Sequence, residues 1–182
     1  ICAGTSVTFT GAPVGTNYNF RVNGGSVQNG ALSTFTTTSL TNGQTVDVIV
    51  TSAAGCSGTS GVITMTVNGN PVAGLTSSDG DNIICAGTGV TFTGSGGSSY
   101  EFFVDGTSVQ SGLSSTYVTS VLSGGQTVTV KVSNAAGCST TSAGITTVVN
   151  ANPVASLVSN DSDNIICAGT SVTFTGAPVG TN

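Results

Sequence analysis

The sequence predicts an all-β protein built from repeated units, and three observations support this fold class. The pentapeptide Ile-Cys-Ala-Gly-Thr begins at residues 1, 84 and 166 of the 182-residue chain, so the repeat period is 83 and then 82 residues. Only 5% of the residues are charged, and there are 27 Gly, no His and no Trp. Thr, Ser, Val and Asn dominate the remainder, so β-branched residues are abundant and helix formers are scarce. Short stretches that alternate apolar and polar residues recur in each repeat, as expected of strands with one buried face.

These stretches can be placed in order along the first repeat. Residues 7–10 and 18–22 carry an apolar side chain at every second position, and Asn23-Gly24-Gly25 predicts a turn after the second stretch. Residues 46–50 predict the longest strand, and Ile63, Met65 and Val67 predict the last one. The second repeat has apolar residues at the matching places, which are Val90, Phe92, Tyr100, Phe102, Val104, Tyr117, Leu122, Val128, Val130, Val132, Ile145 and Val149.

Asn-Pro pairs at 70–71 and 152–153 end the first two repeats, and a new strand follows each pair. About seven strands in roughly 82 residues is the size and spacing of an immunoglobulin-like β-sandwich. We therefore predict tandem immunoglobulin-like β-sandwiches in a head-to-tail array. Residues 1–70 form a repeat that lacks its first strand, 71–152 form a complete repeat, and 153–182 form the truncated beginning of a third. Because the last 17 residues reproduce the first 17 letter for letter, we expect the chain to belong to a longer array.

Charge and residue inventory argue against several classes of function. The net charge is −5 and the only basic residues are Arg21 and Lys131, so we expect no nucleic-acid binding and no attachment to anionic lipid. No apolar run approaches the roughly 18 residues of a membrane span. With no His, one Glu (Glu101) and one Lys, the usual acid–base and nucleophile sets cannot be assembled, so we expect no enzymatic activity. Tyr18 and Tyr100, with Phe20 and Phe102, could form a sugar-stacking platform, but their alternation with other residues favours core packing.

The five cysteines fall into two positional classes. Cys2, Cys85 and Cys167 precede the Val-Thr-Phe-Thr strand, and Cys56 and Cys138 lie in a Gly-Cys-Ser turn near the end of a repeat. Regular cysteines in a small β-domain predict disulfides, whereas a zinc site or a catalytic thiol would need His or a general base.

Two disulfide connectivities are open. Counting one bridge per repeat suggests Cys2–Cys56 and Cys85–Cys138, with Cys167 paired outside the chain. In an immunoglobulin-like fold, however, each of these pairs would lie at opposite ends of one sandwich, roughly 20 Å apart, and bridged Cα atoms lie within about 7 Å. The ends of neighbouring units abut, so this geometry slightly favours a cross-repeat bridge, Cys2–Cys138.

Four of the seven acidic residues lie in two aligned loops. The loops are Ser-Asp-Gly-Asp-Asn at 78–82 and Asn-Asp-Ser-Asp-Asn at 160–164. Such residues are typical turn formers. The alternative is a Ca²⁺ site in each loop, because Ca²⁺ takes carboxylate and amide oxygens. Its ligands would come from Asp79, Asp81, Asn82, Asp161, Asp163 and Asn164. No other cofactor is expected.

Several motifs carry a resemblance to a known family. They are Asp-Asn-Ile-Ile-Cys-Ala-Gly-Thr-x-Val-Thr-Phe-Thr at 81–93, Tyr-x-Phe-x-Val-Asp-Gly at 100–106, Gly-Gly-Gln-Thr-Val at 124–128 and Ala-Ala-Gly-Cys-Ser at 135–139. The chain resembles the Ig-like/PKD-like repeats of giant Bacteroidota surface proteins, including the gliding-motility adhesins that the type IX system secretes. The resemblance implies an extended, extracellular array on the cell surface.

Two functions remain open at this point. The first is a structural stalk or fibre repeat of a cell-surface adhesin, a disulfide-stabilised spacer whose partners are the neighbouring repeats of the same chain. The second is a carbohydrate-binding module, repeated for avidity towards a surface polysaccharide. Self-assembly of chains into a polymer is a third expectation for which the sequence alone suggests no interface.

Overall fold

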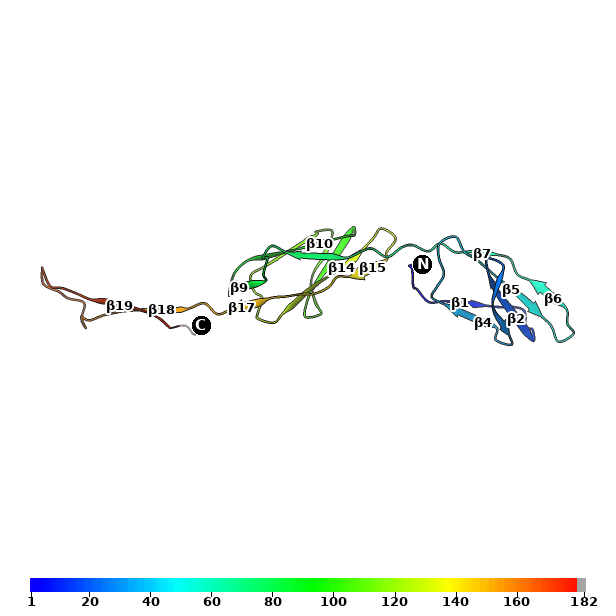
Figure 1. Cartoon of the computed structure of the whole chain (residues 1–182), viewed down its shortest axis with the longest axis horizontal. Helices are drawn as coiled ribbons and strands as arrows, with labels where there is room; N and C mark the ends of the chain where they lie inside the picture. Colours follow the sequence, from blue (N-terminus) through cyan, green and yellow to red (C-terminus); the bar gives the residue numbers. More distant parts are fainter. Residues whose placement is uncertain (180–182) are drawn as a thin grey trace.

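The computed structural model describes residues 1–179, and every regular element in this part of the chain is a β-strand. Residues 180–182, the end of the predicted third repeat, lie outside the described residues. Within residues 1–179 no helix is long and apolar enough to cross a membrane. The molecule is elongated, with two groups of sheets in a row and a two-stranded hairpin beyond them (Figure 1). We refer to residues 1–70 as the N-terminal unit, to 71–152 as the central unit and to 153–179 as the C-terminal segment.

The central unit is a two-sheet sandwich. Its strands are β8 (Gly74–Ser77), β9 (Ile83–Cys85), β10 (Val90–Ser95), β11 (Ser99–Val104), β12 (Thr107–Gly112), β13 (Thr116–Thr119), β14 (Thr127–Ser133), β15 (Ser139–Thr141), β16 (Ile145–Thr146) and β17 (Val148–Asn150). One sheet has the order β13-β10-β8, and the other has the order β12-β11-β14-β15, with β16 also on β14. A parallel pair, β9 and β17, closes one end. This order is that of an immunoglobulin-like sandwich, which confirms the predicted all-β fold class.

The core of the central unit follows from the alternation along its strands. Val128, Val130 and Val132 lie on one face of β14 and are 0% exposed, while the Thr and Lys residues between them are half-buried. Phe92 on β10 and Phe102 on β11 form one buried cluster with Val128 and Val130 and are also fully buried. Because successive side chains of a strand point to opposite faces, this pattern places one apolar row on the inner face of each sheet.

The last strand of each repeat is interrupted, which corrects the expectation of one strand through Ile63, Met65 and Val67. In the N-terminal unit the regular strand covers only Ile63–Thr64. In the central unit the corresponding stretch first forms β15 and β16, which both pair with β14. It then forms β17, which pairs with β9 instead. The strand is broken because its hydrogen-bonding partner changes.

The N-terminal unit repeats the larger sheet of the central unit. Its strands are β1 (Val7–Thr10), β2 (Asn17–Val22), β3 (Gly25–Gly30), β4 (Thr34–Thr37), β5 (Thr45–Thr51), β6 (Ser57–Thr59) and β7 (Ile63–Thr64). The sheet order is β3-β2-β5-β6, with β7 also on β5. Within it, Tyr18, Phe20, Val48 and Val50 form the buried cluster.

The smaller sheet of the N-terminal unit is one strand short. Among the described residues β1 pairs only with β4, whereas its counterpart β10 lies between β13 and β8. Phe9 on β1 is therefore half-buried, while Phe92, at the same place on β10, is 0% exposed.

The C-terminal segment is a hairpin of β18 (Val154–Ser159) and β19 (Phe174–Val179). Its register, with Leu157 opposite Gly176, matches Leu75 opposite Gly94 in the central unit. With no second sheet among the described residues to cover it, the side chain of Leu157 is 69% exposed.

Candidate functional site

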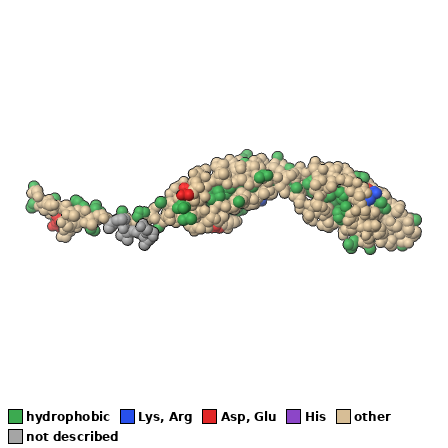
Figure 2. Space-filling view, viewed as in Figure 1, with side chains coloured by type: hydrophobic (Ala, Val, Ile, Leu, Met, Phe, Trp, Pro, Cys, Tyr) green, Lys and Arg blue, Asp and Glu red, His purple; other side chains and the backbone are tan. Residues whose placement is uncertain are grey.

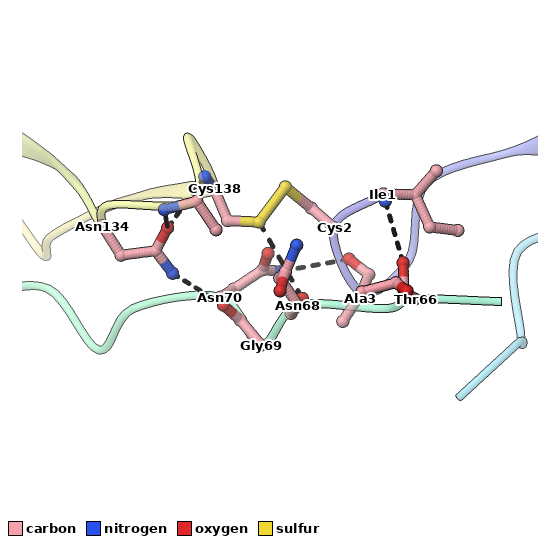
Figure 3. The surroundings of a disulfide bond; sticks show 10 residues. Ile1, Cys2, Ala3, Thr66, Asn68, Gly69, Asn70, Asn134 and Cys138 are labelled. Carbon is pink, nitrogen blue, oxygen red and sulfur yellow. Dashed lines mark hydrogen bonds between the residues drawn. A yellow bond between two sulfur atoms is a disulfide. The ribbon is translucent and has the colours of Figure 1, made fainter. Parts of the chain in front are cut away.

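The junction between the N-terminal and central units is held by a disulfide. Cys2 and Cys138 are bonded although 136 residues separate them in sequence, and their Cα atoms lie 5.5 Å apart (Figure 3). Of the two connectivities that the sequence left open, this is the cross-repeat one. The two units therefore have two covalent connections, the disulfide and the peptide chain through Asn70 and Pro71.

A tight turn presents Cys138 to the junction. The N–H of Asn134 donates to the carbonyl of Cys138 at 2.9 Å, and the N–H of Gly137 donates to the carbonyl of Asn134 at 3.0 Å. Gly137 has φ = 81°, a conformation that glycine adopts readily and that closes the turn. The side chain of Asn134 accepts from the N–H of Cys138 at 3.0 Å and donates to the carbonyl of Gly69 at 2.9 Å. Asn134 thus orders the turn and also reaches across to the N-terminal unit (Figure 3).

Cys2 is held in place by the end of its own unit. It forms a parallel bridge with Asn68, and the N–H of Ala3 donates to the carbonyl of Asn68 at 2.8 Å. The side chain of Asn70 donates to the carbonyl of Ala3 at 3.1 Å. These bonds fix the start of the N-terminal unit against its last residues, beside the linker to the central unit. The sequence analysis used Asn70 only as the boundary of a repeat and did not foresee its hydrogen bond. It missed Asn134, which could have been noticed as the polar residue next to the Gly-Cys-Ser turn.

The intra-repeat pairs Cys2–Cys56 and Cys85–Cys138 are not formed. Cys138 is already bonded to Cys2, and Cys56, Cys85 and Cys167 are free and exposed within the described residues. The length of the strands explains this, because the two cysteines of one repeat lie at opposite ends of a sandwich. Cys2 lies at the junction, whereas β6, which follows Cys56, lies at the opposite end of the N-terminal unit (Figures 1 and 3).

The first acidic loop contains two unsatisfied oxygens. Oδ1 of Asp79 and Oδ1 of Asn82 are buried and have no hydrogen-bond partner among the described residues. Asp81 accepts the N–H of Ile83 at 3.0 Å, and this bond lowers the pKa of the Asp81 carboxyl, as does the neighbouring Asp79 carboxyl. Asn82 has φ = 58° and offers its carbonyl to Val148 on β17. The loop therefore places two buried acceptors without donors beside an ionised carboxylate.

The second acidic loop forms a hydrogen-bonded turn. Oδ1 of Asp161 accepts the N–H groups of Asp163 and Asn164, both at 3.2 Å. Asp163 accepts the N–H of Ile165 at 3.0 Å, which lowers the pKa of its carboxyl. Within the part of the chain that the structure describes, no three His, Cys, Asp or Glu side chains lie together as a metal-binding group. The two loops of similar sequence thus differ, because among the described residues only the first contains buried acceptor oxygens that are unpaired.

Both basic residues are paired with acidic residues across neighbouring strands. Arg21 on β2 donates from Nε to Asp47 on β5 at 2.9 Å, and this hydrogen bond raises the pKa of the guanidinium above its usual value. Lys131 on β14 lies 3.8 Å from the carboxylate of Glu101 on β11. The basic charges sit on separate units, each next to an acid. Figure 2 shows blue atoms on the N-terminal unit and a red patch at the far end of the central unit, next to the C-terminal segment.

The aromatic residues named as a sugar-stacking alternative lie inside the sandwiches. Tyr18, Phe20 and Phe102 are at most 4% exposed. Tyr100 is half-buried, packs against the core, and donates its hydroxyl to the carbonyl of Gly97 at 2.8 Å. These rings fill the core, so their flat faces are not available to a sugar.

Comparisons with known proteins identify no family. No protein-family model matches the chain, and no curated protein matches it. Among solved structures, the chain is similar to the fibronectin(III)-like modules of CbhA from Clostridium thermocellum, with 12% identity over 81% of this chain and 88% of that one and a TM-score of 0.44. It is also similar to murine CEACAM1b, with 9% identity over 82% and 94% and a TM-score of 0.39. A third structure is the amphioxus IgVJ-C2 molecule, with 14% identity over 81% and 99% and a TM-score of 0.36. Because each TM-score is below 0.5, the fold assignment rests on the strand pairing described above.

Proposed function

We propose that this chain is a spacer segment of a long extracellular stalk, in which tandem sandwiches hold a distal part of the protein away from the cell surface. The observation that carries the proposal is the Cys2–Cys138 disulfide between units. A bond inside one unit would stabilise that unit alone. A bond between units limits how far they can bend relative to each other, and a spacer needs such a fixed orientation.

The two covalent connections restrict how the units can move. A single linker is a pivot about which two bodies can bend in any direction. A second connection, here the disulfide beside the 69–71 linker, converts the pivot into a hinge with one remaining axis. The hydrogen bond from Asn134 to the carbonyl of Gly69 spans the same junction and opposes motion about that axis. We therefore infer that this junction is stiff.

The proposed location is extracellular, on a cell surface. Disulfides persist in oxidising compartments and are rare in the cytosol. The sequence motifs at 81–93 and 135–139 resemble repeats of type IX secreted Bacteroidota adhesins, which supports secretion and a role in adhesion or gliding motility. We propose a neighbouring repeat of the same chain as the main partner of each unit.

A non-catalytic role is part of the proposal. The chain has no His, and its single Lys and single Glu lie next to each other on the outer face of neighbouring strands. The carbohydrate-binding alternative has no support from Tyr18, Phe20, Tyr100 and Phe102, which are packed in the cores. A spacer should bind no sugar, so binding of the 182-residue chain to a glycan array would contradict the proposal.

We also propose Ca²⁺ at the first acidic loop. The buried Oδ1 atoms of Asp79 and Asn82 need a donor or a cation, and the carboxylate of Asp81 adds a negative charge. At the second loop Asp161 already accepts two backbone N–H groups, so we expect no ion there. A cation between β8 and β9 would order the end of the central unit that faces the C-terminal segment (Figure 1).

Small-angle X-ray scattering of the intact chain tests the spacer function. We expect one narrow distribution of maximum dimension for the oxidised protein and a broader, more bent ensemble for the Cys2→Ser/Cys138→Ser variant. The matched control is Cys56→Ser, which removes an exposed free thiol from the equivalent turn and should scatter like the parent. Equal ensembles for the parent and the double variant would show that the disulfide does not orient the units and would refute the proposal.

A further inference from the structure

Three side-chain oxygens of the central unit are buried without a hydrogen-bond partner among the described residues. Two of them are Oδ1 of Asp79 and Oδ1 of Asn82, in the first acidic loop, which connects β8 to β9. The third is the hydroxyl of Thr147, a residue that is only 1% exposed. Buried polar groups are normally paired, so each of these oxygens calls for an explanation.

The fold brings Thr147 next to the acidic loop. Thr147 lies at the break between β16 and β17, where the chain leaves β14 and pairs with β9. The N–H of the next residue, Val148, donates to the carbonyl of Asn82 at 2.8 Å. From there β9 and β17 run side by side at the end of the central unit that faces the C-terminal segment (Figure 1). The residues with unpaired oxygens therefore gather at one end of one sandwich.

The backbone at this place does not require a hydroxyl. In the N-terminal unit Met65 occupies the position of Thr147. The N–H of Met65 donates to the carbonyl of Gln44 at 2.8 Å, and the N–H of Thr147 donates to the carbonyl of Gln126 at 3.0 Å. The same backbone pairing thus accepts an apolar side chain. What Thr147 adds to the end of the central unit is one buried oxygen.

The charge at the loop favours a cation over a water molecule as the partner of these oxygens. The carboxyl of Asp79 is within hydrogen-bonding reach of the carboxyl of Asp81, a contact that contributes to the lowered pKa of Asp81. Two ionised carboxylates in contact repel each other, and a water molecule brings no charge to offset this. Carboxylate and amide oxygens suit a hard cation such as Ca²⁺. Figure 2 shows acidic atoms at this end of the central unit.

We propose that the hydroxyl of Thr147 is a ligand of the Ca²⁺ ion at the first acidic loop, so that the ion ties the last strand of the unit to the β8–β9 connection. This inference rests on the Ca²⁺ site proposed above and adds to it a ligand from the other end of the repeat. An ion held by the loop alone orders only the loop. An ion shared with Thr147 also fixes the point at which the chain changes its strand partner.

The consequence is a form of regulation. β17 leads directly into the linker at residues 152–153, and β9 pairs with β17 along its whole length. A cation that joins the loop to Thr147 therefore holds both strands of this pair at their first residues. Extracellular Ca²⁺ then controls how firmly the end of the central unit is closed, and with it how rigidly the linker leaves the sandwich.

The first experiment titrates CaCl₂ into the intact, oxidised chain by isothermal titration calorimetry. Thr147→Val keeps the shape of the side chain and removes its oxygen. We expect this variant to bind Ca²⁺ at least about tenfold more weakly than the parent, since even groups that only support a metal ligand have effects of this size. The matched control is Thr141→Val, the same change at an exposed position of β15, and its affinity should equal that of the parent.

The second experiment compares melting temperatures with and without Ca²⁺. In EDTA, Thr147→Val should melt no lower than the parent, because it removes a buried hydroxyl that has no partner among the described residues. At a Ca²⁺ concentration that half-saturates the parent the order should reverse, since the parent binds more of the ion. Under the same condition, hydrogen exchange of the Val148 amide, which bonds to Asn82, should slow in the parent and much less in the variant.

The outcomes separate this inference from the Ca²⁺ site on which it rests. If Ca²⁺ neither binds to the parent nor raises its melting temperature, the site and the inference are both wrong. If the parent and Thr147→Val bind Ca²⁺ equally, the site stands and the role of Thr147 is refuted. A variant that melts below the parent by the same amount in EDTA and in Ca²⁺ would show that the hydroxyl pairs with water or protein instead, which also refutes the inference.

Discussion

Removal of the cross-unit disulfide should destabilise both units by similar amounts. The perturbation is the double variant Cys2→Ser/Cys138→Ser. With the disulfide intact, an unfolded N-terminal unit is a closed loop of about 68 residues, from Cys2 to Asn70, whose ends are held at the junction. An unfolded central unit is likewise closed over about 68 residues, from Asn70 to Cys138. Chain entropy assigns about 4 kcal/mol to closing a loop of this length.

Differential scanning calorimetry measures the effect. For domains of this size 1 kcal/mol corresponds to about 4–8 °C, so both transitions should fall by roughly 15–30 °C in the double variant. The control Cys56→Ser removes an exposed thiol that has no disulfide partner, and its transitions should move little, by about 0.5 kcal/mol or less. If only one transition moved, or if neither moved by more than a few degrees, the bond would not restrain both unfolded units and the reasoning would fail.

Four further predictions concern single residues and strands. Asn134→Ser removes the hydrogen bond to the carbonyl of Gly69 and should cost about 1 kcal/mol, measured by chemical denaturation. Millimolar Ca²⁺ should raise the melting temperature of the parent and of Asp161→Asn but not of Asp79→Asn, because only Asp79 lies in the loop with unpaired buried oxygens. The pKa of Asp81 is lowered from 3.8 in the folded state, so its carboxylate stabilises the fold above that pH and the contribution is lost as pH falls through the lowered value. In a pH series, the melting temperature of Asp81→Asn should therefore decline less at acid pH than that of the parent. By hydrogen-exchange mass spectrometry, amides of β5 should exchange faster than those of β14, since the valines of β5 are up to 8% exposed and those of β14 are 0% exposed.

The sandwich itself could be predicted because its signal is local. The alternation at Val128, Val130 and Val132 and at Val46, Val48 and Val50 belongs to strands with one buried face, and the structure buries both rows. The interruption of the last strand could not be predicted in this way. It arises where the chain leaves β14 for β9, a change of partner that depends on tertiary pairing and leaves no period in the sequence.

The junction was predictable only in part. Strand length separates Cys2 from Cys56 and so favoured the cross-repeat bridge. The presence of two cysteines at similar places in each of the first two repeats nevertheless kept the intra-repeat pairs open. The roles of Asn134 and Asn70 depend on where their side chains point, which periodicity does not encode. The two acidic loops have similar sequences and would be given one role from sequence. Among the described residues, however, only the loop at Asp79 contains buried oxygens without a hydrogen-bond partner.

Because the repeats are nearly identical, a strand of one unit can pair wrongly with another unit, and the disulfide at the junction opposes this. A strand that fits one unit fits every unit, because residues 1–17 and 166–182 are the same and β18 resembles β8. Chains of similar domains are accordingly prone to exchange elements between the wrong units. A bond from Cys2 to Cys138 keeps two consecutive units in contact even while one of them is unfolded, so the correct neighbour is present at high effective concentration when strands pair again. The disulfide thus selects partners during folding as well as limiting motion afterwards.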